Sequence, residues 1–314
     1  MKNIFLYRMQ KSGYGKLLLN GMLFLALVFM LDWAIGSVLR YYYFKQTSGL
    51  LYRTTYSIEK TTSPLLVMGS SRANHHYDPS LLSKNLGKEA YNTGRDGNYI
   101  FYNYAVLKCI LKRYTPSVII YDFTLSDLQA EPDSYDRLSS LLPYYQKHPE
   151  VRPVVELRSP FEKVKLVSGI YPFNSLLFTI MRGNNASPAG EENETNGFIP
   201  LDNHWNKPIA APLAKDNIPT IDSTKVKYFK MYIDACQAAG IKLYMVFSPV
   251  FINYTESPKA LQEARKVLKE KGVVFYDFSA DSSFTNHPEF FSDPVHLNKE
   301  GARKFSDTIG TLIQ

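Results

Sequence analysis

The sequence contains only two cysteines, Cys109 and Cys236, in 314 residues. So few thiols exclude the disulfide-rich scaffolds of small secreted domains. Each cysteine falls on the apolar side of an expected helix, which favours buried free thiols and leaves one long-range bridge as the alternative. The chain also lacks a dense block of lysine and arginine. Its net charge of +7 is scattered apart from a cluster at the N-terminus, so the composition does not indicate nucleic-acid binding.

No internal repeat is evident, and the composition is that of a globular protein. Hydrophobic residues make up 45% of the chain and charged residues 21%, which excludes wholesale disorder. A chain of this length can bury a substantial core as one large domain or two ordinary ones.

The N-terminus predicts a membrane span. Residues 17–39 are almost continuously apolar. As a helix, these residues would be about 34 Å long, against roughly 30 Å for the hydrocarbon core of a bilayer. The run is preceded by basic residues and by no acid: Lys2, Arg8, Lys11 and Lys16. This flank predicts a cytoplasmic N-terminus, with the rest of the chain periplasmic or extracellular.

Asp32 interrupts the apolar run. A carboxylate deep in lipid costs about 2.5 kcal/mol or more, so Asp32 and the adjacent Trp33 are expected at the outer interface. The string "AIGS" at residues 34–37 resembles a signal-peptidase site, which makes a cleaved signal peptide the alternative. We favour an uncleaved single-pass anchor within residues 1–40.

Beyond a polar, aromatic-rich connector at residues 41–63, strand and helix patterns alternate. Short apolar segments predict strands at residues 64–69, 89–93, 117–123, 241–247 and 272–278. Apolar residues at helical spacing fill the intervals after the second, third and fourth of these strands, and a last helix closes the chain. The pattern predicts a flavodoxin-like three-layer α/β/α sandwich with a parallel five-stranded sheet over residues 64–314. Residues 124–220 break the alternation and are expected to form an inserted cap, with a mobile tip near residues 183–196.

The first strand runs into Gly69, Ser70 and Ser71. In open α/β sheets, ligands bind beyond the carboxyl ends of the strands, where this turn lies. A serine needs a base to act as a nucleophile. Asp293 and His296 directly precede the final helix, and a carboxylate three residues before a histidine can hold its Nδ1–H and direct Nε2 outward. The spacing therefore predicts a site that joins a serine, His296 and Asp293.

At these residues the chain resembles the SGNH, or GDSL-like, family of esterases and acyltransferases. "GSS" at residues 69–71 stands where the family has its Gly-Asp-Ser block, and "DPVH" at 293–296 matches the closing Asp-x-x-His block. The resemblance implies Ser71 as nucleophile, His296 as base and Asp293 as the residue that orients the base. In "YNTGRDGN" at 91–98, it implies an oxyanion hole made by the N–H groups of Ser71 and Gly97. The family's oxyanion-hole asparagine has no counterpart in "YDFTLSDL" at 121–128.

The predicted function is an exported, membrane-anchored serine esterase or O-acyltransferase. It would act on acyl esters, expected to be acetyl, of a cell-surface glycan, without cofactor or metal. Two alternatives remain. The missing asparagine suggests a non-catalytic glycan-binding or assembly protein. His75 and His76, with Asp293 and His296, suggest a metal-dependent phosphoesterase. Arg72 is expected to be a solvated arginine, and the sequence gives no indication of the oligomeric state.

Overall fold

The computed structural model describes residues 13–185, 196–206, 220–252 and 257–314. The chain divides into two compact units. We call residues 1–46 and 159–186 the anchor unit, and residues 47–158 and 187–314 the sheet unit. The basic residues Lys2, Arg8 and Lys11 lie outside the described residues, and so does most of the expected tip near residues 183–196.

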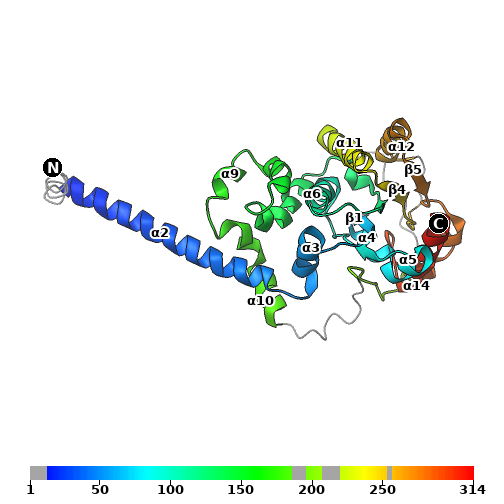
Figure 1. The fold of residues 1–314 in the computed structure, drawn as a ribbon, viewed down its shortest axis with the longest axis horizontal. Helices are drawn as coiled ribbons and strands as arrows, with labels where there is room; N and C mark the ends of the chain where they lie inside the picture. Colours follow the sequence, from blue (N-terminus) through cyan, green and yellow to red (C-terminus); the bar gives the residue numbers. More distant parts are fainter. Residues whose placement is uncertain (1–12, 186–195, 207–219, 253–256) are drawn as a thin grey trace. The chain divides into compact units, whose positions relative to one another are not determined.

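The sheet unit is built on five parallel strands (Figure 1). They are β1 (Leu65–Gly69), β2 (Ala90–Asn92), β3 (Val118–Asp122), β4 (Lys242–Phe247) and β5 (Val274–Asp277). Their order across the sheet is β2-β1-β3-β4-β5, the order of flavodoxin-like folds. Each strand lies within the range predicted for it, so the α/β fold class and the five-stranded parallel sheet are confirmed.

Helices cover both faces of the sheet, because alternate side chains of each strand point to opposite faces. Leu65, Val67 and Ile120 belong to a buried cluster on one face, which also contains Phe305 and Ile309. That face is covered by α4 (Ser71–His76), α5 (Pro79–Leu86) and α14 (Lys299–Leu312). On the other face, Tyr232 contacts Tyr121 with ring centroids 4.9 Å apart. Tyr232 lies on α11 (Ser223–Ala238), which packs against α6 (Ile100–Leu111).

Local capping explains where the helices begin and end. The Asp222 side chain accepts hydrogen bonds from the first turn of α11, and the Asn298 side chain does the same for α14. Helix α12 (Lys259–Lys271) follows Pro258 and ends at Gly272, whose φ of 64° places it in the left-handed region that favours glycine. Both cysteines are free and buried, as the helical pattern favoured, and burial raises the pKa of each thiol to about 12.

The expected connector and cap are arranged differently from the prediction. Helix α3 (Gly49–Glu59) lies within residues 41–63 and packs against α6 in the sheet unit. Residues 124–158 also belong to the sheet unit, whereas residues 159–186 belong to the anchor unit. In the sheet unit the insertion forms short α-helical and 3₁₀-helical segments: η1 (Leu125–Asp127), α7 (Asp133–Asp136), η2 (Arg137–Tyr144), η3 (Pro149–Val151), α8 (Arg152–Val155) and η4 (Glu156–Arg158).

The anchor unit consists of α2 (Gly13–Phe44), α9 (Glu162–Lys165), η5 (Tyr171–Leu176) and α10 (Leu177–Asn185). Helix α2 is long and apolar enough to cross a membrane, and only 11% of its most apolar window is buried. Its length and composition are consistent with the single-pass span predicted for the N-terminus, and equally with a signal sequence. The remaining elements belong to the sheet unit: α13 (Ser282–Thr285), η8 (Pro288–Phe290), and the antiparallel pair β6 (Phe291–Asp293) and β7 (His296–Leu297).

Candidate active site

A sharp turn at the end of β1 presents Ser71. Gly69 has a φ of 143°, and a Cβ there would lie 2.7 Å from the Asp122 carbonyl oxygen, so this position requires glycine. Ser70 is the N-cap residue of α4 and is buried. Ser71 is the first residue of that helix and is half-buried. The turn therefore encloses the first serine and leaves the second accessible.

The structure brings Ser71, His296 and Asp293 into one hydrogen-bonded chain. His296 Nε2 lies 2.7 Å from Ser71 Oγ, across 225 residues of sequence. His296 Nδ1 lies 2.8 Å from Asp293 Oδ2. Because a carboxylate only accepts, Nδ1 carries the proton and Nε2 is left to accept from the serine hydroxyl. This is the arrangement that allows a histidine to remove the proton of a serine.

Asp293 is held by the backbone of its own turn. Its Oδ1 accepts hydrogen bonds from Val295 N–H at 2.8 Å and His296 N–H at 3.0 Å. Burial opposes ionisation of the carboxyl, but the hydrogen bonds from His296 and Val295 outweigh it and lower the pKa of Asp293. An ionised Asp293 therefore faces His296 at neutral pH.

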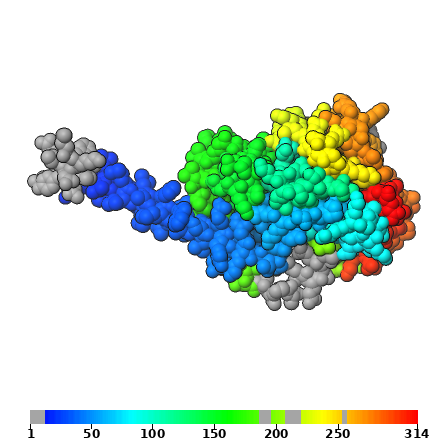
Figure 2. Space-filling view, in the orientation of Figure 1, coloured from blue at the N-terminus to red at the C-terminus, as the bar shows by residue number. Residues whose placement is uncertain are grey.

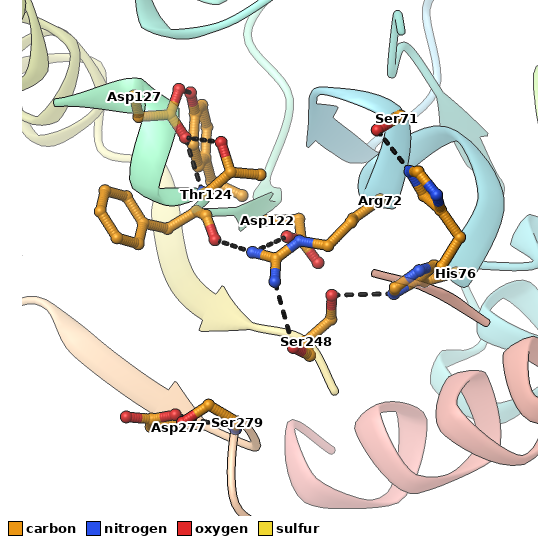
Figure 3. Close-up of polar contacts among 12 residues, drawn as sticks. Ser71, Arg72, His76, Asp122, Thr124, Asp127, Ser248, Asp277 and Ser279 are labelled. Atoms are coloured by element: carbon orange, nitrogen blue, oxygen red, sulfur yellow. Dashed lines mark hydrogen bonds and ion pairs between the residues drawn. The ribbon is translucent and has the colours of Figure 1, made fainter. Parts of the chain in front are cut away.

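His76 supports the turn that carries His296. Leu297 N–H donates to His76 Nε2 at 2.9 Å, so Nε2 is unprotonated and Nδ1 donates to Ser248 Oγ at 2.8 Å (Figure 3). The ring is fully buried. Burial, and then the proximity of His296 and Arg72, place the pKa of His76 well below its ordinary value. His76 is thus a neutral residue that fixes the backbone next to His296.

We expect His76→Phe to destabilise the sheet unit. The substitution leaves the buried Leu297 N–H and the Ser248 hydroxyl without their partner. An unsatisfied buried polar group costs about 1–3 kcal/mol, so the free energy of unfolding should fall by about this amount in urea denaturation. His287→Phe is the matched control because the His287 side chain is 44% exposed and contacts the exposed Glu289 carboxylate and the Phe290 ring rather than a buried polar group. An equal loss in both variants would contradict the role assigned to His76.

The expectation of a solvated Arg72 is wrong. Its side chain is buried, and its guanidinium lies 3.0 Å from Asp122 Oδ1 (Figure 3). It also donates to the carbonyl oxygens of Phe123 and Ser248, and it lies over the Phe247 ring at 4.3 Å from the centroid. A solvated position was expected because the arginine follows two serines in a polar turn. The ends of β3 and β4 instead surround it with acceptors and exclude water.

A hollow of about 350 Å³ opens beside Ser71 and His296. Its other lining residues include Ser70, Tyr99, Thr124, Ser126, Gln129 and Val250. Gly97 is not among the described residues that line this hollow. Its φ is 66°, and a Cβ there would lie 2.3 Å from Arg137 Nη1, so Gly97 lies against that guanidinium. Its part in an oxyanion hole stays a prediction.

Two further polar residues line the hollow, Thr124 and Ser70, and sequence reasoning named neither of them as an oxyanion-hole donor. Thr124 lies two residues after the end of β3, where the family asparagine was sought. Its hydroxyl donates to Asp127 Oδ2 at 3.2 Å, so it has no proton left to donate to a substrate. Ser70 Oγ is buried and has no hydrogen-bond partner among the described residues. The position of Thr124 after a strand was the available signal. Nothing in the sequence distinguished Ser70 as unpaired.

The two histidines of the metal hypothesis are both engaged with protein groups. His75 Nδ1 lies 2.7 Å from the Ile199 carbonyl oxygen, and Nε2 lies 3.1 Å from Asp96 Oδ2. Burial opposes ionisation of Asp96, but the hydrogen bond from His75 helps to lower the pKa of that carboxyl to about 2. Elsewhere in the described chain, one group has the spacing of metal ligands: Cys109, His148 and Glu150. None of these three lines the hollow.

Known proteins resemble this chain only at low sequence identity. No protein-family model matches the chain, and no curated protein matches it in sequence. Among solved structures, an acetyl xylan esterase is 12% identical, with a TM-score of 0.42, and the match covers 80% of this chain and 100% of that one. A protein assigned as an acylhydrolase from Bacteroides fragilis NCTC 9343 is 10% identical, with a TM-score of 0.39, over 79% of this chain and 85% of that one.

Proposed function

We propose that the protein is an exported, membrane-anchored serine esterase or O-acyltransferase that acts on acyl esters of a cell-surface glycan. The observation that carries this proposal is the hydrogen-bonded chain Ser71–His296–Asp293 beside an open hollow. The long apolar α2 supports the membrane location. The acyl group is expected to be acetyl, which is small enough for a hollow of about 350 Å³.

The chemistry follows from the protonation states. Ser71 Oγ attacks the acyl carbonyl carbon while its proton passes to His296 Nε2, and Asp293 stabilises the imidazolium that forms. The tetrahedral intermediate collapses as Nε2–H protonates the departing alkoxide, which leaves an acyl-serine. Water or a sugar hydroxyl then attacks the carbonyl carbon of this ester and gives its proton to His296 Nε2. The bond to Ser71 Oγ breaks as Nε2–H returns that proton to Oγ, which releases the acid or the acylated sugar and restores the Ser71 hydroxyl. No step requires a cofactor.

The oxyanion needs donors aimed at the carbonyl oxygen. We expect the N–H groups of Ser71 and Gly97 to be two of them, as the resemblance implies. For the third, in the absence of the family asparagine, we propose the Ser70 hydroxyl. It lines the hollow, it is buried, and no described residue accepts or donates to it. An unpaired buried hydroxyl costs about 1–3 kcal/mol, and this cost would be relieved when the substrate oxygen binds.

Labelling by a fluorophosphonate probe tests the proposal. We expect the full-length protein in detergent micelles to be labelled covalently, and a chelator to leave the rate unchanged. His296→Ala should slow labelling by about 10²–10⁴-fold because the hydroxyl loses its base. His287→Ala, which changes a partly exposed histidine that directly precedes η8 and does not line the hollow, is the control and should label like the wild type. Absence of labelling in the folded wild type would favour the non-catalytic glycan-binding alternative, and loss with chelator would favour the phosphoesterase.

A further inference from the structure

The second half of α2 is joined closely to the segment 159–185 of the anchor unit. Asp32 accepts hydrogen bonds from Ser168 Oγ and Gly169 N–H, both at 2.6 Å. One turn further along, a Cβ on Gly36 would lie 2.3 Å from the Gly169 carbonyl carbon, so the two backbones touch. The Asp32 carboxylate therefore satisfies hydrogen-bond donors of the segment 159–185. This contact explains why an acidic residue interrupts the apolar run of α2.

The contact continues to the C-terminal end of α2. Tyr43 is buried and packs against Phe173, with ring centroids 5.6 Å apart. The Tyr42 carbonyl oxygen accepts a hydrogen bond from Asn184 Nδ2 at 2.9 Å. Helix α2 from Asp32 onward is therefore part of a folded unit. Removal of the helix by a signal peptidase would leave the Gly169 N–H and the Phe173 ring without their partners.

The first half of α2 differs from the second. Between Leu17 and Leu31, drawn in blue in Figure 2, every large apolar side chain except Leu19 is exposed. A helix that is apolar on every side is typical of a membrane span. Gly13 to Asp32 is 20 residues, or about 30 Å of helix, which matches the roughly 30 Å of the hydrocarbon core. Lys16 lies in the first turn of this stretch, where its long side chain can extend to the headgroups. Asp32 and the residues that cap it thus lie one membrane thickness along the helix from Gly13.

The segment 159–185 exposes large apolar side chains of its own. Phe161, Val164 and Val167 recur every three residues around α9 and are 65%, 70% and 66% exposed. On α10, Phe178 is 87% exposed and Met181 61% exposed. These five side chains define the apolar surface of the segment.

Exposed basic residues accompany these apolar ones. Lys163 and Lys165 lie between the apolar residues around α9, where Lys165 pairs with Glu162 at 2.8 Å, and Arg182 follows Met181 on α10. Apolar side chains interleaved with lysine and arginine on short helices are typical of segments that lie in the interface of an anionic bilayer.

We propose that residues 159–185 form an interfacial platform that inserts the apolar surface into the leaflet at the C-terminal end of α2, and that α2 is retained in the mature protein as the partner of this platform. The occupant is lipid rather than a protein. The apolar surface belongs to the same unit as the exposed apolar half of α2. The segment is joined to α2 through Ser168 and Gly169 at Asp32, the position where the helix would leave the hydrocarbon core.

A fluorescent probe placed on the platform tests this directly. The full-length variant Phe178→Cys, labelled with a nitrobenzoxadiazole group, is reconstituted in vesicles of phosphatidylcholine and phosphatidylglycerol. We expect its emission to shift to shorter wavelength and to be quenched more by lipids spin-labelled near the headgroup than by lipids spin-labelled near the chain end. Val274→Cys is the matched control, because Val274 is an exposed apolar residue of the sheet unit, and its probe should do neither.

Two results would overturn the proposal. One is a Phe178 probe that behaves like the Val274 probe. The other is a Phe178 probe that is shielded from water but not quenched by any lipid, which would mean that a protein covers the surface. Asp32→Leu supplies an independent arm: it removes the acceptor of Ser168 and Gly169 while making α2 more apolar. We expect the Phe178 probe to lose its quenching in this variant, and retained quenching would contradict the proposal. We also expect the intact mass of the membrane-bound wild type to include residues 13–44, and a mass that lacks them would contradict the retention of α2.

Discussion

Replacing Ser71 by alanine is expected to abolish both fluorophosphonate labelling and turnover of an aryl acetate. The hydroxyl that would form the acyl bond is lost, and His296 has no proton to remove. The thermal midpoint should stay nearly unchanged, since Ser71 is half-buried and water can replace its hydroxyl at His296 Nε2. Labelling followed by mass spectrometry of the peptide that contains residues 69–76 identifies the modified residue.

Ser70→Ala is the matched control for this prediction, because it removes the same hydroxyl one residue away. The variant should still be labelled at Ser71, with a rate lower by roughly a hundredfold if Ser70 Oγ is an oxyanion donor. Its stability should not fall, since the hydroxyl has no partner among the described residues to lose. A dead Ser70→Ala enzyme together with normal labelling of Ser71→Ala would assign the nucleophile to Ser70. Normal labelling of both variants would refute the serine mechanism.

Arg72→Met is expected to cause a large loss of stability. The substitution leaves Asp122 buried without its cation and removes a donor from the carbonyl oxygens of Phe123 and Ser248. Breaking a buried ion pair by removing one partner costs about 3–5 kcal/mol. The loss should appear in urea denaturation of the full-length protein followed by circular dichroism.

Two controls separate the ion pair from the rest of the arginine's contacts. Arg113 also donates to backbone carbonyls, those of Ile58 and Thr61, and lies over a tyrosine ring, but its side chain is exposed and these bonds lie near the surface. Arg113→Met should therefore cost clearly less. The double variant Arg72→Met/Asp122→Asn removes the unpaired charge and should recover part of the stability. Equal losses in all three variants would show that the charge pair is not what stabilises this edge of the sheet.

Local patterns were sufficient to predict most of the sheet unit. The apolar runs that became β1 to β4 contain side chains that only a sheet covered on both faces can bury. Asn298 and Gly272 mark helix ends through their own side-chain or backbone chemistry. The pairing of Asp293 with His296 is local too, because a three-residue turn brings the carboxylate to Nδ1.

Ser71, in turn, follows a strand that ends at the same edge of the sheet as the other strands, so its meeting with His296 could be anticipated from topology.

Other features depend on partners far away in the sequence. His76 is one of two adjacent histidines, and nothing near it distinguishes its role from that of His75; its acceptor and donor roles come from Leu297 and Ser248, which are 221 and 172 residues away. Arg72 looks solvated until the ends of β3 and β4 converge on it. The division of the insertion between the two units was likewise not predictable, since residues 159–185 have the same short helical pattern as residues 124–158.

The sequence by itself therefore determined the class of fold, the apolar span and the three residues of the candidate site, because periodicity, capping and turn chemistry act between residues a few positions apart. Only the tertiary structure decided which polar groups are buried, which of them are paired, and that Asp32 is a cap for residues 168–170 rather than only a marker of the interface. Those outcomes depend on which surfaces pack together, and packing joins residues whose separation along the chain places no constraint on their separation in space.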